Sequence, residues 1–204
     1  MRMTPPARDR LVAPAMPGGD DVGSPQSLSL ADRRIVAAWA ADCAERVLGL
    51  FEQESPADPR PREAITRARA FARGESDAAG EIRRRFVAGR AANDVSTPAA
   101  VAAARAAAQA AGVAHMGAHA LGAAAYAAKA AGLAAPEDTD AVDAEIRWQL
   151  DRLSIEAADA LRRLPQLGAD SAGPLGAGLL SSGILAATIR AIQTGVAEAE
   201  HPPA

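Results

Sequence analysis

The sequence predicts an all-α protein, a single helical bundle of about five to six helices preceded by a disordered arm. Apolar residues recur three or four positions apart along most of the chain, which is the spacing of a helix face. No segment alternates apolar and polar residues as a strand would. The chain is also rich in alanine, the strongest helix former. Its 204 residues are enough to bury one sizeable core.

The chain divides into three parts by composition. Residues 1–27 are rich in Pro, Gly and Asp and lack an apolar run, so they predict a disordered N-terminal arm and not a signal peptide. Residues 28–167 carry the helical periodicity and form the predicted domain. Residues 168–204 begin with a glycine-rich stretch and predict a linker and an extra C-terminal helix.

Three helices are expected in the first half of the chain. The first spans 29–53, with Ser29 as N-cap followed three residues later by an acidic residue. The second spans 61–74, with Pro61 in its first turn, and the third spans 76–92. The inner face of the first helix is expected to hold Ile35, Trp39, Cys43, Val47, Leu50 and Phe51.

Three further helices follow. The fourth spans 97–132, with Thr97 as its cap and a bend at Gly112. The fifth spans 139–164 and ends before a proline, and the last spans 179–197. Short connections predict that neighbouring helices are antiparallel.

Composition excludes several classes of protein. The net charge of −3 gives no support for nucleic-acid binding. The single cysteine, Cys43, excludes an internal disulfide and fits the reducing cytoplasm. Two uncharged stretches, 106–128 and 171–189, consist mainly of small residues and are too weakly apolar for membrane spans. We therefore expect a soluble, cytoplasmic protein without a membrane or nucleic-acid partner.

Two histidines interrupt the alanine-rich fourth helix. His115 and His119 are four residues apart, which places both imidazoles on one helix face, with Tyr126 further along it. Such a pair can share a metal ion, but Met116 occupies the position of the catalytic Glu of a His-Glu-x-x-His motif. A third ligand would have to come from another helix, with Asp42, Cys43 or Glu45 as its source. We therefore expect no metal and no cofactor; whether the histidines are structural, catalytic or metal-binding stays open.

The first helix carries a second polar group. Asp42 and Arg46 form an ordinary i, i+4 pair, although Asp42 is also placed to accept from the indole of Trp39 or to orient a histidine of the fourth helix. Cys43 lacks a nucleophile motif and is interpreted as a small core residue. The candidate catalytic residues, should the protein be an enzyme, are His115, His119, Asp42, Tyr126 and Cys43.

Charge is unevenly distributed along the chain. Between Arg60 and Arg90 nine arginines face four acids, and between Glu137 and Asp170 nine acids face four arginines. These segments either pack near each other or form solvated faces. A second interpretation makes Arg83, Arg84 and Arg85 a docking patch for an acidic partner.

Several segments together carry a family resemblance. They are Ala-Trp-Ala-Ala-Asp-Cys-Ala-Glu-Arg-Val-Leu at 38–48, Arg-Pro-Arg-Glu-Ala-Ile at 60–65, the alanine-rich run with both histidines at 114–129, and Trp-Gln-Leu at 148–150. Over about residues 30–153 the chain resembles the Imm5-like immunity proteins of actinobacteria. The resemblance implies an immunity role and supplies no catalytic residue. The residues it singles out are Trp39, Asp42, Cys43, His115, His119 and Tyr126.

The resemblance favours a small cytoplasmic protein that acts by protein binding and neutralises a cognate toxin. The docking face would be the patch Arg83–Arg85 or the acidic fifth helix. The alternative is an enzyme of specialised metabolism or a small-molecule-binding protein, with an Asp/His/Tyr pocket between the first and fourth helices. A homodimer through the apolar face of the C-terminal helix is expected only where that helix does not fold back.

Overall fold

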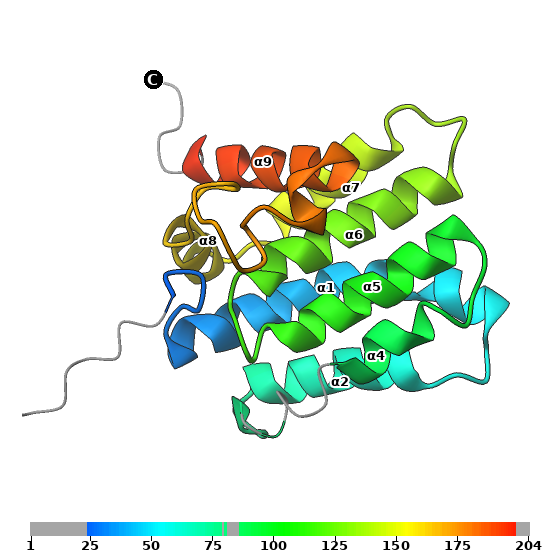
Figure 1. Cartoon of the computed structure of the whole chain (residues 1–204), viewed down its shortest axis with the longest axis horizontal. Helices are drawn as coiled ribbons and strands as arrows, with labels where there is room; N and C mark the ends of the chain where they lie inside the picture. Colours follow the sequence, from blue (N-terminus) through cyan, green and yellow to red (C-terminus); the bar gives the residue numbers. More distant parts are fainter. Residues whose placement is uncertain (1–23, 79, 81–85, 199–204) are drawn as a thin grey trace, which may run out of the picture.

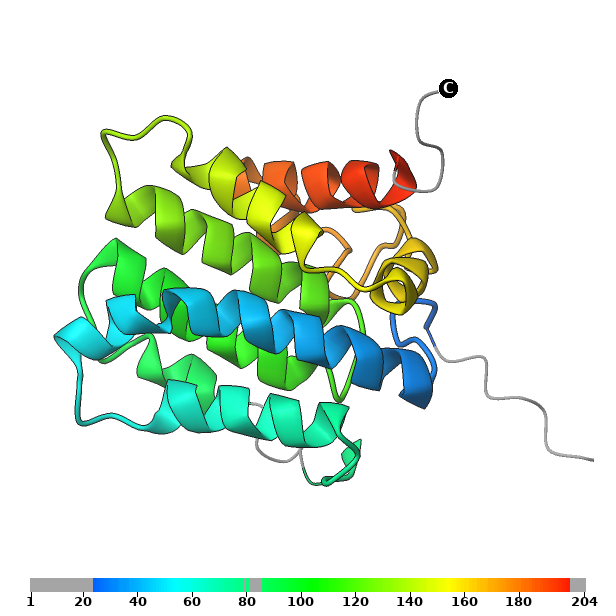
Figure 2. The same cartoon turned by 180° about the vertical axis from the view of Figure 1, so that it is seen from behind.

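Three helices that lie side by side form the centre of the fold (Figure 1; Figure 2 from behind). The computed structural model describes residues 24–78, 80 and 86–198, and every regular element within them is a helix. The all-α prediction is confirmed for these residues, with more and shorter helices than predicted. They are α1 (Leu30–Glu54), α2 (Arg60–Ala72), α4 (Phe86–Ala91), α5 (Pro98–Gly112), α6 (His119–Ala134), α7 (Ala141–Asp151), α8 (Ile155–Arg162), the short 3₁₀ helix η1 (Leu179–Ser181) and α9 (Gly183–Glu198).

The central helices are α1, α5 and α6, which all contact one another. Helices α2 and α4 cover α5 on one side, α7 and α9 cover α6 on the other, and α8 contacts α1 and α9 (Figure 1). Most side chains of α5 and α6 are alanine and buried, so the two backbones approach closely. Several of the larger core side chains come from the helices around them, including Phe51 of α1, Phe71 of α2 and Ile189 of α9.

Helix α1 follows its prediction closely. The hydroxyl of Ser29 accepts a hydrogen bond from the backbone N–H of Asp32 at 3.1 Å, which is the predicted N-cap. The predicted inner face is buried at Trp39, Cys43 and Phe51. The start of α1 can thus be predicted from the sequence, because both the N-cap and the apolar face are local features.

The prediction of one helix over 97–132 is wrong. Helix α5 ends at Gly112 and α6 begins at His119, and the two pack against each other as neighbours. Within the intervening turn, the backbone N–H groups of Gly117 and Ala118 donate to the carbonyls of Ser27 and Gln26, both at 3.0 Å. These long-range bonds satisfy backbone donors that a continuous helix would bond internally. Consequently His115 and His119 do not lie on one face of one helix.

The fifth predicted helix, 139–164, is also wrong, because it is two helices. Helix α7 ends at Asp151, and Ser154 starts α8 as an N-cap whose hydroxyl accepts from the N–H of Ala157 at 3.1 Å. Serine competes with helical backbone bonding in this way and favours helix starts over helix interiors.

Gln26, near the start of the described residues, is held in place by hydrogen bonds. Gln26 falls within the predicted arm of residues 1–27, yet only 1 % of its surface is exposed. Its amide Nε2 donates to Asp170 and Ala172, both at 2.7 Å, and its Oε1 accepts from the N–H of Leu175 at 2.9 Å. Gln26 is therefore part of the folded structure, in contrast to the prediction, and residues 1–23 of the predicted arm lie outside the described residues.

The C-terminal helix folds back onto the bundle. Helix α9 contacts α6, α7 and α8, and Leu185 and Ile189 are buried there together with Leu180 of η1. Leu179 and Ile184 stay exposed. The condition for the expected homodimer, an apolar helix face left uncovered, is thus not met. No helix within the described residues is long and apolar enough to cross a membrane.

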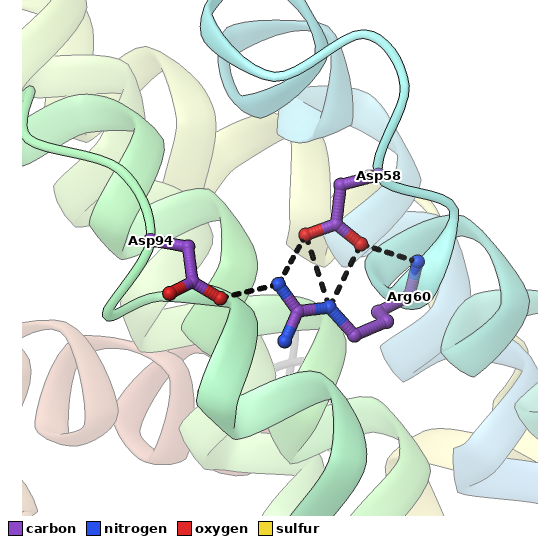
Figure 3. A network of polar contacts seen from close by, with 3 residues as sticks. All are labelled: Asp58, Arg60 and Asp94. Atoms are coloured by element: carbon purple, nitrogen blue, oxygen red, sulfur yellow. Dashed lines mark hydrogen bonds and ion pairs between the residues drawn. The ribbon is translucent and has the colours of Figure 1, made fainter.

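Ion pairs tie the arginine-rich second helix to its surroundings. Figure 3 shows Arg60 at the start of α2 between two carboxylates: its Nε lies 2.8 Å from Asp58 Oδ1, and its Nη2 lies 2.5 Å from Asp94 Oδ2. The hydrogen bonds from Arg60 lower the pKa of Asp58. Further along α2, Arg62 pairs with Glu52 of α1 at 2.7 Å. The positive charge of α2 is therefore balanced by neighbouring carboxylates, in large part from α1.

Candidate functional site

A shallow groove of about 350 Å³ lies where α1, α2 and the end of α7 meet. We call it the Trp148 groove. The indole of Trp148, on α7, is half-buried between two guanidinium groups: Cζ of Arg46 lies 4.3 Å from the ring centroid and Cζ of Arg152 lies 5.2 Å from it. Such stacking attracts the cations to the ring face and fixes both side chains. The groove is lined by Asp42, Glu45, Arg46, Arg69, Trp148 and Arg152.

A polar chain from the core supports this groove. Trp39 of α1 donates its indole N–H to the backbone carbonyl of Gln149 at 2.8 Å, one of the carbonyls that the end of α7 leaves without a helical partner. The Gln149 side chain is fully buried and donates to Glu145 at 3.1 Å. Glu145, itself 4 % exposed, accepts from Nε of Arg46 at 2.6 Å. The position of Arg46 over Trp148 is thus determined from inside the protein.

The opposite wall of the groove is an ion-pair cluster. Arg69 of α2 reaches α1, where Nη2 lies 2.8 Å from Asp42 Oδ1 and also pairs with Glu45. Burial acts to lower the pKa of Arg69, but the two carboxylates outweigh it and the net shift is upward. The groove therefore presents fixed charges of both signs around an aromatic ring.

The histidines lie elsewhere, in a cleft between α4, α5 and the start of α6. His115 is exposed in the α5–α6 turn, His119 is half-buried, and their ring centroids are 6.5 Å apart. Nδ1 of His119 lies 2.7 Å from Oε1 of Gln109, an oxygen that only accepts, so this ring nitrogen donates. Helix α1 touches the turn through Arg33, which donates to the carbonyls of Ala114 and His115 at 2.9 and 3.2 Å.

The structure does not bring the candidate catalytic residues together. Asp42 belongs to the Trp148 groove and pairs with Arg69, so it neither accepts from the Trp39 indole nor orients a histidine. Tyr126 is 3 % exposed, with Cζ of Arg105 5.8 Å from its ring centroid. The Asp/His/Tyr pocket expected between the first and fourth helices is therefore not formed.

Cys43 is buried completely in the core. Burial first, and then the nearby charges of Glu145 and Asp42, raise the pKa of its thiol well above the usual range. Because the thiolate is the nucleophile, this environment suits a packed core residue. Among the described residues no three His, Cys, Asp or Glu side chains cluster as metal ligands would. Arg83, Arg84 and Arg85, the predicted docking patch, lie outside the described residues.

Comparison with protein families gives a match over most of the described chain. The model of a family described as "Imm-5 like putative immunity protein" matches residues 26–156. The chain belongs to this Imm-5 like family. No curated protein and no solved structure matches the chain.

The Imm-5 like match covers some surfaces of the protein and leaves others outside it. All six residues that line the Trp148 groove fall within it, as do both histidines. Most of α8 and all of α9 lie beyond it. The match begins at Gln26, the residue that bonds to the segment 170–175 beyond the family region.

Sequence reasoning singled out Asp42 and Arg46 but missed the other half of the groove. In the sequence, Trp148 stands out only as part of the family resemblance, and Arg69 and Arg152 only as members of charged segments. A signal was present in the Trp-x-x-x-Arg spacing of Trp148 and Arg152, because residues four apart lie next to each other on a helix surface.

Proposed function

We propose that this protein neutralises a cognate toxin by binding it in the cytoplasm, and that the Trp148 groove is its docking surface. The observation that carries the proposal is the half-buried Trp148 held between Arg46 and Arg152 inside the family region. Tryptophan and arginine are the residue types that most often dominate the energy of protein interfaces. Membership in an immunity family supplies the class of partner, a toxin.

The groove also meets a physical requirement of tight binding. Its side chains are already fixed by ion pairs and stacking, so a partner would lose less side-chain entropy on docking. No carboxylate among the described residues forms an ion pair with Arg152. A toxin surface with an acidic side chain beside an apolar one would complement Arg152 and Trp148.

The test first identifies the toxin. Each reading frame flanking this protein's gene is expressed from an inducible promoter, alone and together with this protein. We expect one frame to arrest growth and this protein to restore it. Absence of any frame whose toxicity this protein relieves would contradict the neutralising function.

Two variants then test the surface. Arg152→Glu and Trp148→Ala are expected to raise the Kd for the purified toxin at least tenfold, since interface tryptophans and arginines commonly contribute about 2 kcal/mol or more. Arg147→Glu is the matched control, because Arg147 lies on the same helix, is exposed and pairs with Asp140 outside the groove. Full protection by folded Arg152→Glu and Trp148→Ala variants would place the docking surface elsewhere.

A further inference from the structure

The cleft beside the histidines has a volume of about 460 Å³ and takes no part in the proposed docking surface. It lies between α4, α5 and the first residue of α6, and its size falls in the range of small-molecule sites. The apolar part of its lining consists of small residues, among them Gly89 on α4 and Ala108 on α5. The polar side chains that line it are those of Arg90, Gln109, His115 and His119.

The pair formed by His119 and Gln109 is built into the packing of the two central helices. A Cβ at Gly112 would lie 2.9 Å from Cγ of His119, and a Cβ at Gly122 would collide with Oε1 of Gln109. Both glycines lie in alanine-rich segments of the chain, and glycine in a helix interior, as at Gly122 of α6, costs about 0.5–1 kcal/mol relative to alanine. An alanine at either glycine would displace the imidazole or its partner.

The remaining polar groups of the cleft favour an anion. Arg90, exposed at the end of α4, supplies a permanent positive charge, and the exposed ring of His115 adds nitrogen atoms that can donate. The NH2 group of Gln109 is a further donor, since its oxygen faces His119. Among the described residues that line the cleft, none is Asp or Glu.

We propose that this cleft binds a small organic anion. Arg90 and His115 hold its carboxylate or phosphate group, and its apolar part packs on Ala108 and the fixed ring of His119. The arginine fork matches the geometry of either group. This proposal is independent of toxin neutralisation, because it uses a different face and none of the groove residues.

The experiment follows the imidazole NMR signals of the full-length protein during titration. The chain has three histidines, and His201, outside the described residues, serves as the internal reference. The probes are benzoate and phenyl phosphate, with uncharged benzamide as the control of equal shape. We expect saturable shifts of the His115 and His119 signals with one or both anions, and the stronger binder identifies the anionic group. Shifts that do not saturate, or equal shifts with benzamide, would overturn the proposal.

Variants test the construction of the site. Gly112→Ala displaces the His119 ring and is expected to weaken binding of the tighter anion at least tenfold; Arg90→Gln removes the fixed charge and has a similar effect. Gly49→Ala is the matched control, since nothing lies within 4 Å of a Cβ at this exposed position of α1. Because Arg90 is exposed, Arg90→Gln keeps the test informative if Gly112→Ala fails to fold. Unchanged affinity in the folded Arg90→Gln variant would also overturn the proposal.

Discussion

Gln26 provides the sharpest test of how the family region holds the C-terminal part of the chain. Its amide makes three hydrogen bonds to the segment 170–175, two through Nε2 and one through Oε1, and its backbone carbonyl accepts from Ala118. Gln26 thus joins the N-terminal segment to the α5–α6 turn through its backbone and to the segment before η1 through its side chain. Gln26→Glu keeps the shape of this side chain and changes only its hydrogen-bonding atoms and charge.

The expected cost follows from the two bonds that Nε2 makes. Replacing this donor by an oxygen removes both bonds and leaves the carbonyl of Ala172 without its donor, which costs about 1–3 kcal/mol. The new carboxylate also faces Asp170, where the donor distance is now 2.7 Å. Two unit charges at this distance repel by about 6 kcal/mol at an effective dielectric constant near 20. The introduced glutamate can avoid this repulsion by binding a proton. For an ordinary pKa near 4.3, binding the proton at pH 7 costs about 3.7 kcal/mol, which is therefore the upper limit of the charge penalty. A proton bound to the new carboxyl also restores one hydrogen-bond donor. We therefore expect Gln26→Glu to lower the free energy of unfolding by about 3–5 kcal/mol in total.

The pH dependence gives an independent check. Asp170 raises the folded-state pKa of the introduced carboxyl above its unfolded value of about 4.3. The charge penalty is therefore full above the folded-state pKa and disappears as the pH falls below about 4.3. Urea denaturation followed by circular dichroism measures both effects, with Gln166→Glu, at an exposed position, as the matched control. A Gln26→Glu variant within about 0.5 kcal/mol of the parent at pH 7 would refute the reasoning, since this is the scatter of ordinary surface changes.

Two further predictions concern buried and capping groups. Hydrogen bonds from the hydroxyl of Thr97, and then from Ser96, lower the pKa of Glu54 to about 2, so its stabilising effect is present above pH 4.5 and is lost as the pH falls through about 2. Urea midpoints should therefore be lower for Glu54→Gln at pH 7 and converge with the parent between pH 4.5 and 2; a constant difference would contradict this role. Cys43 should react with a thiol reagent far more slowly in the native protein than in urea, as its burial and raised pKa require. Equal rates in the two conditions would show that the core at this position is open.

Helix boundaries were predictable from the sequence where local chemistry sets them. Ser29 caps α1 as predicted, because the capping bond and the apolar face that follows are both local. At α5 the local expectation was incomplete: Thr97 lies at the N-cap position, but its side chain makes no capping bond and donates to Glu54 of α1. The carboxylate of Glu54 also accepts from the backbone N–H groups of Ser96 and Thr97, so α1 supplies the acceptor at the start of α5.

The break between α5 and α6 could not be predicted in the same way. The alanine tract favours helix at nearly every position, and propensity alone gives no reason to stop at Gly112. The turn is stabilised by carbonyls of Gln26 and Ser27, about ninety residues earlier in the sequence, and by Leu28, which packs where a Cβ of Gly117 would otherwise lie. Long-range contacts of this kind override local preference and are invisible to periodicity.

The polar residues of α1 show why a chemical interpretation of a motif can select the right residues and the wrong role. The sequence favours Asp42 as the acceptor of the Trp39 indole N–H or as the residue that orients a facing histidine. In the fold, Trp39 satisfies a carbonyl at the end of α7 and Asp42 holds Arg69, while the histidines occupy another cleft. Both residues therefore act on α7 and α2, the two helices that complete the groove with α1. The proposed docking surface combines three helices, and a small shift between α1 and α7 would separate Trp148 from Arg46. Polar residues beside a buried tryptophan can thus hold neighbouring helices in place as readily as they can form an active site.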